Sequence, residues 1–420
     1  MRAITYGFLL SLWASLPANA AVSDSDFAEF KAEFAKMAQR VSALEAENKA
    51  LRKSNESTLK EVQLNRGELG KVSKAAQSAP WTESVSLKGD FRYRYEEIDE
   101  QGKNKRDRNR VRARAAITAK LPNRVEVGLG LASGGDDPVS TNQTLGGANT
   151  TKGLQLDLAY AAWQPTDELR VIAGKMKNIF YRPQKNPMLW DGDLNPEGLA
   201  IIYKSGMVFA NLMGNWLESD SKSDNRRFTW GAQGGLKTKV GGASLTAGIG
   251  YYELGTKGKS SFYGDDDDFY GNSFVCADPN NDASCVYAHD YEELELFANL
   301  STSVADLPLN VFVDYVTNQA VDNNDTGYAL GAKLGKASKP GSWQVAYIYQ
   351  DLEADAALGL VSDSDFAGGG MDGKGHIFKG AYAINKQWSF GFTYFATERG
   401  EAVNKERDYD RLQIDTKFKY

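Results

Sequence analysis

Histidine and cysteine are almost absent from this sequence, with two residues of each among 420. These side chains supply most general acid–base catalysis and most imidazole or thiolate metal ligands. A hydrolase would have only His289 and His376 to use as its base. We therefore expect no enzyme activity, no metal site and no cofactor.

A basic field and a high proline content are also missing. The net charge is −6, which predicts no binding to nucleic acid. Proline is rare (11), whereas glycine (41), tyrosine (20) and phenylalanine (19) are common. This balance is typical of long β-hairpins and is unusual for an α/β enzyme.

Long apolar runs are missing beyond the N-terminus. Residues 1–20 combine Arg2, a short apolar run over 4–16 and the small-residue motif Ala18-Asn19-Ala20. This order predicts a signal peptide that is removed before Ala21. The alternative is a membrane-anchoring helix, although the run is shorter than the roughly 20 residues that a span needs.

Residues 21–73 have the heptad pattern of a coiled coil. Apolar residues alternate in steps of three and four along a seam, strongly at Phe27, Phe30, Phe34, Met37, Val41 and Leu44, and more weakly from Leu51 onward. Such a helix has no core of its own, so we expect the seam to pack against other copies as an oligomerisation stalk. The alternative is an amphipathic helix that lies on its own barrel or plugs its mouth. Residues 74–81 read as a linker.

Residues 82–420 repeat one unit, which is about ten alternating residues followed by a connection. Phe91 and Tyr93 alternate with Arg92 and Arg94, so each set falls on one face of a strand. About sixteen such segments occur, and their connections are alternately long and short. A soluble β-sandwich does not require its connections to alternate between long and short. The sequence therefore predicts an all-β transmembrane antiparallel barrel of about 16 strands, with membrane lipid and lipopolysaccharide around it.

With these features the chain resembles the general porin superfamily of Gram-negative outer membranes. It is most similar to the "putative porin" families that place a coiled coil before the barrel, and its plan is similar to that of phosphate-selective porins. The last strand ends on Phe418 and Tyr420, which resembles the aromatic signal read by the barrel assembly machinery. The resemblance implies a homotrimeric outer-membrane channel for passive diffusion, with the coiled coil in the periplasm.

The third long connection, residues 178–196, resembles the porin loop that folds into the lumen and narrows it. The resemblance implies a constriction in which basic side chains face carboxylates. We expect it to contain Arg92, Arg94, Arg112, Arg114, Lys175, Lys177, Arg182, Lys185, Asp191, Asp193 and Glu197. The row of arginines favours a preference for anions. The alternative is that these arginines merely pair with neighbours in a wet wall.

Two further expectations concern the chain outside the constriction. Residues 255–290 hold Cys276 and Cys285, which we expect to form a disulfide in an exported protein. The run from Asp265 to Asp268 in the same segment could bind Ca²⁺ or bridge lipopolysaccharide cations, but an acidic solvated loop is the simpler reading. A second function, in which the coiled coil tethers the envelope to peptidoglycan, is compatible with a channel.

Overall fold

The computed structural model describes residues 24–77, 84–219 and 225–420. The expected signal peptide, residues 1–20, and residues 78–81 of the expected linker lie outside these ranges, whereas residues 74–77 of that linker are helical. The chain divides into two compact units, residues 1–79 and residues 80–420, which are a helix and a barrel in their described parts.

The first unit contains a single long helix, α1 (Asp24–Gln77, 54 residues). On the seam, Met37, Val41, Leu44 and Leu51 are each more than half exposed in the single chain. The side chains of the remaining seam residues, Phe27, Phe30 and Phe34, lie outside the described residues. No helix among the described residues is long and apolar enough to span a membrane.

The second unit is a closed antiparallel β-barrel of sixteen long strands, counted over residues 84–219 and 225–420. This confirms the predicted fold class. The strands are β1 (Val85–Glu100), β2 (Arg106–Leu121), β3 (Val125–Ser133), β5 (Leu154–Trp163), β6 (Leu169–Lys175), β7 (Glu197–Ser205), β8 (Val208–Glu218), β9 (Arg227–Val240), β10 (Ala243–Leu254), β13 (Tyr291–Val304), β14 (Leu307–Asn318), β15 (Thr326–Gly335), β16 (Trp343–Leu352), β17 (Gly373–Ala383), β18 (Trp388–Arg399) and β19 (Arg407–Lys419).

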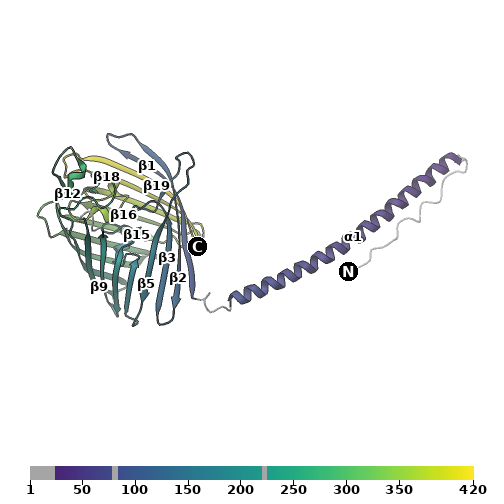
Figure 1. Cartoon of the computed structure of the whole chain (residues 1–420), viewed down its shortest axis with the longest axis horizontal. Coiled ribbons are helices and arrows are strands. Elements are labelled where there is room, and N and C mark those ends of the chain that lie inside the picture. The colour runs from purple at the N-terminus through teal and green to yellow at the C-terminus, as the bar shows by residue number, and fades with distance from the viewer. Residues whose placement is uncertain (1–23, 78–83, 220–224) are drawn as a thin grey trace. The chain divides into compact units, whose positions relative to one another are not determined.

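The barrel closes because the first strand pairs with the last. β1 is hydrogen-bonded to β2 on one side and to β19 on the other, and Figure 1 shows β1 and β19 side by side. Closure leaves neither strand with an unpaired backbone edge, which a sheet in lipid could not tolerate.

The two faces of the strands differ as the alternation predicts. On β1, Phe91 and Tyr93 are 39% exposed on the outer surface, whereas Arg92 and Arg94 are buried. Bulky apolar side chains such as Trp163, Trp216 and Trp343 are likewise exposed on the outside. The barrel wall therefore has an apolar outer face and, on β1, a charged inner face.

The connections form two groups that alternate around the barrel, here called short and long, although residues 101–105 equal residues 164–168 in length and residues 336–342 equal residues 319–325. The short ones are residues 122–124, 164–168, 206–207, 241–242, 305–306, 336–342 and 384–387. The long ones are residues 101–105, 134–153, 176–196, 219–226, 255–290, 319–325, 353–372 and 400–406. Short elements lie within some of the long ones: β4 (Gln143–Thr144), η1 (Pro183–Lys185), β11 (Phe274–Cys276), η2 (Asp282–Ser284), β12 (Cys285–Tyr287), η3 (Gly359–Val361) and η4 (Phe366–Gly368).

The main apolar core lies inside the barrel and is built largely from connections. Phe180 and Trp190 of the 176–196 connection contact Tyr252 on β10 at ring-centroid distances of 4.8 and 5.0 Å. Leu358 and Phe366 of the 353–372 connection are fully buried in the same cluster. Two long connections thus fold inward and occupy part of the lumen.

Candidate functional site

Basic side chains gather on the inner face of three neighbouring strands. Register pairs Arg92 of β1 with Arg112 of β2 and with Lys417 of β19, so these three side chains form a row on one face. The whole set, here called the arginine wall, consists of Arg92, Arg94, Arg108, Arg110, Arg112, Arg114, Arg411 and Lys417. The side chains of a β-strand alternate between its two faces, so every second residue faces the lumen. This alternation places the residues of the arginine wall on the inner face.

Carboxylates on the same strands pair with part of the arginine wall. Arg94 binds Asp415 through two nitrogens, Nε at 2.7 Å and Nη2 at 3.0 Å. Asp90 accepts hydrogen bonds from Arg112 at 2.8 Å and from Arg114 at 2.8 Å. Planar guanidinium groups suit such forked contacts with carboxylates.

Glu96 is the most deeply buried acid of the wall. Its carboxylate pairs with Arg411 at 2.5 Å and with Arg108, and Arg110 lies 3.9 Å away. The side chain has no exposed surface, so its charge is balanced by these guanidinium groups together with Arg94 at 3.9 Å and the amide of Gln413 at 3.3 Å.

The 176–196 connection brings Asp193 to the arginine wall. Its carboxylate contacts Arg114 at 2.8 Å and Arg112 at 3.5 Å, and it accepts a hydrogen bond from the Thr141 hydroxyl at 2.9 Å. The structure thus brings together three of the predicted constriction residues in direct ion pairs.

The same connection is fixed to the opposite side of the barrel. Tyr181 donates its backbone N–H to Gln233 on β9 at 2.7 Å, and Gln184 donates to the Asn310 carbonyl on β14 at 2.8 Å. Asn186 donates to Gln350 on β16 at 3.2 Å. The connection therefore crosses the interior from β6 and β7 to these strands, where it restricts the lumen.

Three other predicted residues of this connection stay away from the arginines. Arg182 donates to the Trp190 carbonyl at 2.6 Å, and Lys185 is exposed on η1. Asp191 is buried and accepts the backbone N–H groups of Asp193 at 2.7 Å and Ser364 at 3.2 Å. Asp191 shapes the backbone and does not face the wall as a free charge.

Lys175, Lys177 and Glu197 lie at the strand ends beside the wall. Lys175 pairs with Glu197 at 2.7 Å, and Lys177 lies 3.6 Å from Asp157. Lys175, Glu197 and Asp193 line one cavity of about 490 Å³ between β3, β5 and the 176–196 connection. Lys175, Lys177 and Glu197 border the constriction but pair with one another or with Asp157, so that of these residues only Asp193 faces the wall's arginines.

The 353–372 connection is a part of the interior that the sequence did not reveal. It touches the arginine wall through Asp365, which lies 3.2 Å from Arg94 and 2.6 Å from Arg411. It also touches the first inward connection, because Asp191 donates its backbone N–H to the Val361 carbonyl at 2.9 Å. Its apolar run around Leu358 was the one signal of burial available in the sequence.

The 255–290 connection contains the Cys276–Cys285 disulfide, which joins the small strands β11 and β12. In its acidic run, Asp268 accepts the backbone N–H of Asp265 at 2.8 Å. Among the described residues no group of three or more acidic, histidine or cysteine side chains is arranged to hold a metal ion.

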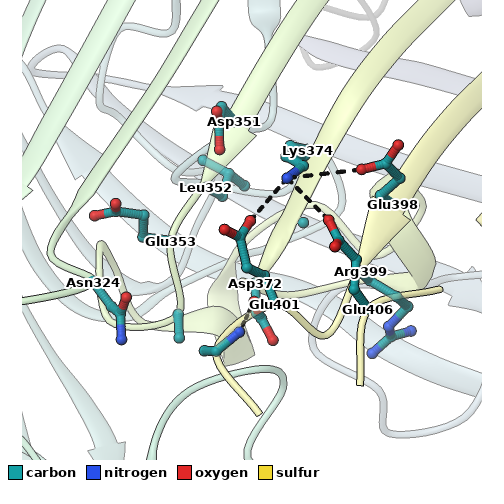
Figure 2. Close-up of a pocket in the computed structure, with 13 residues that line it drawn as sticks. Asn324, Asp351, Leu352, Glu353, Asp372, Lys374, Glu398, Arg399, Glu401 and Glu406 are labelled. Atoms are coloured by element: carbon teal, nitrogen blue, oxygen red, sulfur yellow. Dashed lines mark hydrogen bonds and ion pairs between the residues drawn. The ribbon is translucent and has the colours of Figure 1, made fainter. Parts of the chain in front are cut away.

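A separate pocket lies at the ends of β16, β17 and β18 (Figure 2). Its centre is Lys374, whose Nζ lies 2.9 Å from Glu401, 3.0 Å from Glu406 and 3.7 Å from Glu398. The single ammonium group balances only part of this acidic rim, and the cavity of about 230 Å³ does not include the arginine wall.

The chain ends in the closing seam. Tyr420 exchanges backbone hydrogen bonds with Gly89 at 3.0 and 3.1 Å, and its hydroxyl donates to the Arg114 carbonyl at 3.1 Å. Phe418 stacks on Trp388 with ring centroids 5.3 Å apart. The terminal aromatic residues predicted as an assembly signal therefore lie on the seam itself.

Comparison with known proteins places this barrel in a family. The family model described as "Putative porin" matches residues 99–262 and 281–420. No match to the sequence was found among curated proteins. Among solved structures, Pseudomonas putida OprB is similar with a TM-score of 0.55 and 12% identity, over 84% of this chain and 97% of that one.

A multiply substituted Rhodopseudomonas blastica porin is similar with a TM-score of 0.47 and 11% identity, over 80% of this chain and 100% of that one. The family match and the closed barrel identify an outer-membrane channel rather than an enzyme. Since the family model covers most of its length, the chain belongs to the "Putative porin" family.

Proposed function

We propose that the protein is a passive diffusion channel for small hydrophilic solutes and ions, with a preference for anions. The observation that carries this proposal is the charge balance of the arginine wall. Its eight cationic side chains are paired by five carboxylates, Asp90, Glu96, Asp193, Asp365 and Asp415. The excess positive charge lines the narrowed part of the lumen.

Selectivity in such a channel is an electrostatic effect. A positive surface inside a low-dielectric wall raises the local concentration of anions and lowers that of cations. Arg92 contributes most directly, because its side chain donates a hydrogen bond to the neutral amide of Asn142 rather than to a carboxylate. The protein moves no proton and forms no covalent intermediate in this mechanism.

The test is a reversal potential in planar bilayers across a KCl gradient. The wild-type channel should show the sign of an anion-selective pore, and replacing Arg112 and Arg114 with glutamine should lower its chloride-to-potassium permeability ratio by about twofold or more. Arg124→Gln is the matched control, because Arg124 is exposed on the turn between β2 and β3. Cation preference in the wild-type channel would remove the proposal.

We also propose that α1 is a periplasmic stalk that holds three copies together. Support comes from its continuous helix and from a seam whose Met37, Val41, Leu44 and Leu51 are exposed in the single chain. A tether to the cell wall through the same helix is the second candidate. Deleting residues 21–75 separates the roles: loss of envelope attachment with normal conductance identifies a tether.

The remaining proposed partners belong to the membrane environment. The apolar outer face fits the lipid and lipopolysaccharide of the outer membrane, and the terminal Phe418 and Tyr420 fit recognition by the barrel assembly machinery. Omitting the last strand should abolish membrane insertion, which fractionation of the envelope would detect.

A further inference from the structure

The 353–372 connection spans the barrel interior from β13 and β14 to the arginine wall. At the β13 end, Glu293 accepts the backbone N–H of Leu358 at 2.9 Å, and Asn318 of β14 donates to the Asp355 carbonyl at 2.9 Å. At the other end, Arg411 of β19 pairs with Asp365 at 2.6 Å. In barrel order these strands are separated by β15 to β18. The connection therefore covers a large sector of the lumen.

Asp365 is the charged contact of this connection with the wall. Its carboxylate lies between two guanidinium groups, Arg94 at 3.2 Å and Arg411 at 2.6 Å. The side chain of Asp365 keeps 24% of its surface exposed, while those of Arg94 and Arg411 are at most 5% exposed. The carboxylate is thus the more accessible partner of the pair.

Asp193 and Asp365 have parallel roles on different connections. Asp193 reaches Arg112 and Arg114 on β2, whereas Asp365 reaches Arg94 on β1 and Arg411 on β19. Each inward connection brings one carboxylate to its own section of the arginine wall. Together they divide the wall's positive charge into a neutralised part and a part that faces solutes.

We propose that Asp365 is a specificity-determining residue of the channel and that the 353–372 connection is a second constriction loop. This deepens the proposed function, because it assigns the ion selectivity of the lumen to two loops. The Asp365 carboxylate lowers the anion preference that the arginine wall would otherwise have.

The position of the loop does not depend on Asp365 alone. Asn272 donates to the carbonyls of Ala354 at 2.7 Å and Ala357 at 2.8 Å and accepts the N–H of Gly359 at 2.8 Å. Asp191 of the first inward connection holds Val361. A neutral, isosteric replacement at residue 365 therefore changes the charge and leaves the loop in place.

The experiment compares full-length Asp365→Asn, Asp365→Glu and Asp322→Asn in planar bilayers with a KCl gradient. Asp365→Asn should raise the chloride-to-potassium permeability ratio about twofold, because it removes a unit negative charge from a side chain that is 24% exposed inside the barrel. Asp365→Glu keeps the charge and should match the wild type. Asp322→Asn removes the same charge from an exposed position in the 319–325 connection and should also match it.

A second variant keeps the test decisive if Asp365→Asn fails to fold. Ser364→Asp adds a carboxylate next to Asp365, where Arg411 already donates to the Ser364 carbonyl at 3.4 Å, and should lower the permeability ratio about twofold. Equal ratios for Asp365→Asn and Asp322→Asn, or an unchanged ratio for Ser364→Asp, would overturn the inference. The changes in permeability ratio are measured relative to the wild type, so they test the role of Asp365. The sign of the wild-type reversal potential tests the proposed anion preference separately.

Discussion

Gly198 lies on β7 where the neighbouring strand β8 leaves no room for a side chain. A Cβ atom at this position would lie 2.0 Å from the Gly214 carbonyl oxygen and 2.7 Å from the Cα of Asn215. Both are backbone atoms, so no side-chain rotation can relieve the contact. The pairing of β7 with β8 therefore requires glycine here.

Gly198→Ala should weaken the barrel by about 1–3 kcal/mol, because the backbone of β7 or β8 must shift to admit the methyl group. The measurement is the urea midpoint of unfolding, followed by heat-dependent mobility in gels. Gly380→Ala on β17 is the matched control, since nothing lies within 4 Å of its added Cβ. Equal midpoints for the two variants would contradict the prediction.

At the scale of elements, the inward connections depend on a few buried polar anchors. Asn272 is 4% exposed and forms three hydrogen bonds with the backbone of the 353–372 connection. The buried amide of Asn272 thus supplies the hydrogen-bond partners that backbone groups of the connection would otherwise find in a neighbouring strand.

Asn272→Ala should destabilise the inward position of the 353–372 connection by about 1–3 kcal/mol, because three backbone groups lose their partner. Hydrogen–deuterium exchange of the amides at 354–371 should become faster by about fivefold or more, while exchange in the strands stays unchanged. Asn280→Ala, an exposed asparagine in the same 255–290 connection, is the control. Unaltered exchange in the Asn272 variant would show that the apolar packing alone holds the loop.

The strands could be predicted from the sequence because their signal is local. Period two places Phe91 and Arg92 on opposite faces, and the sixteen long strands over residues 84–219 and 225–420 match the expected number. Charge type alone favours a place in the constriction for Lys175 and Glu197, whereas in the structure they pair with each other at its border. Their pairing depends on the register of β6 with β7, which sets Lys175 opposite Glu197 and which neither strand shows in its own sequence.

The second inward connection could not be predicted for a different physical reason. Residues 353–372 have no periodicity, and their anchors Asn272, Glu293 and Asp191 lie 60 to 180 residues away in the sequence. Contacts over such separations leave no local pattern. The heptad seam of α1 has a clear pattern, and its packing against other copies stays a prediction.

At the scale of the whole molecule, the stalk proposal predicts an oligomer that depends on α1. The double variant Met37→Asp and Leu44→Asp should dissociate the full-length protein in detergent, because charges would be buried at the seam. Light scattering coupled to size-exclusion chromatography measures the mass. Gln39→Asp with Ala46→Asp places the same charges off the seam and should leave the mass unchanged. If the seam variant keeps the wild-type mass, α1 does not hold the copies together.

The closing seam also has a consequence for the order in which the molecule is completed. The ion pair of Arg94 with Asp415 joins residues 321 positions apart, and that of Arg411 with Glu96 joins residues 315 apart. Because a chain is synthesised from its N-terminus, Arg94 and Glu96 emerge long before their partners exist. The pairing of β19 with β1 therefore completes both the backbone hydrogen bonds of the barrel and the ion pairs of its charged lining. A barrel without this last pairing has an open wall and lacks those ion pairs.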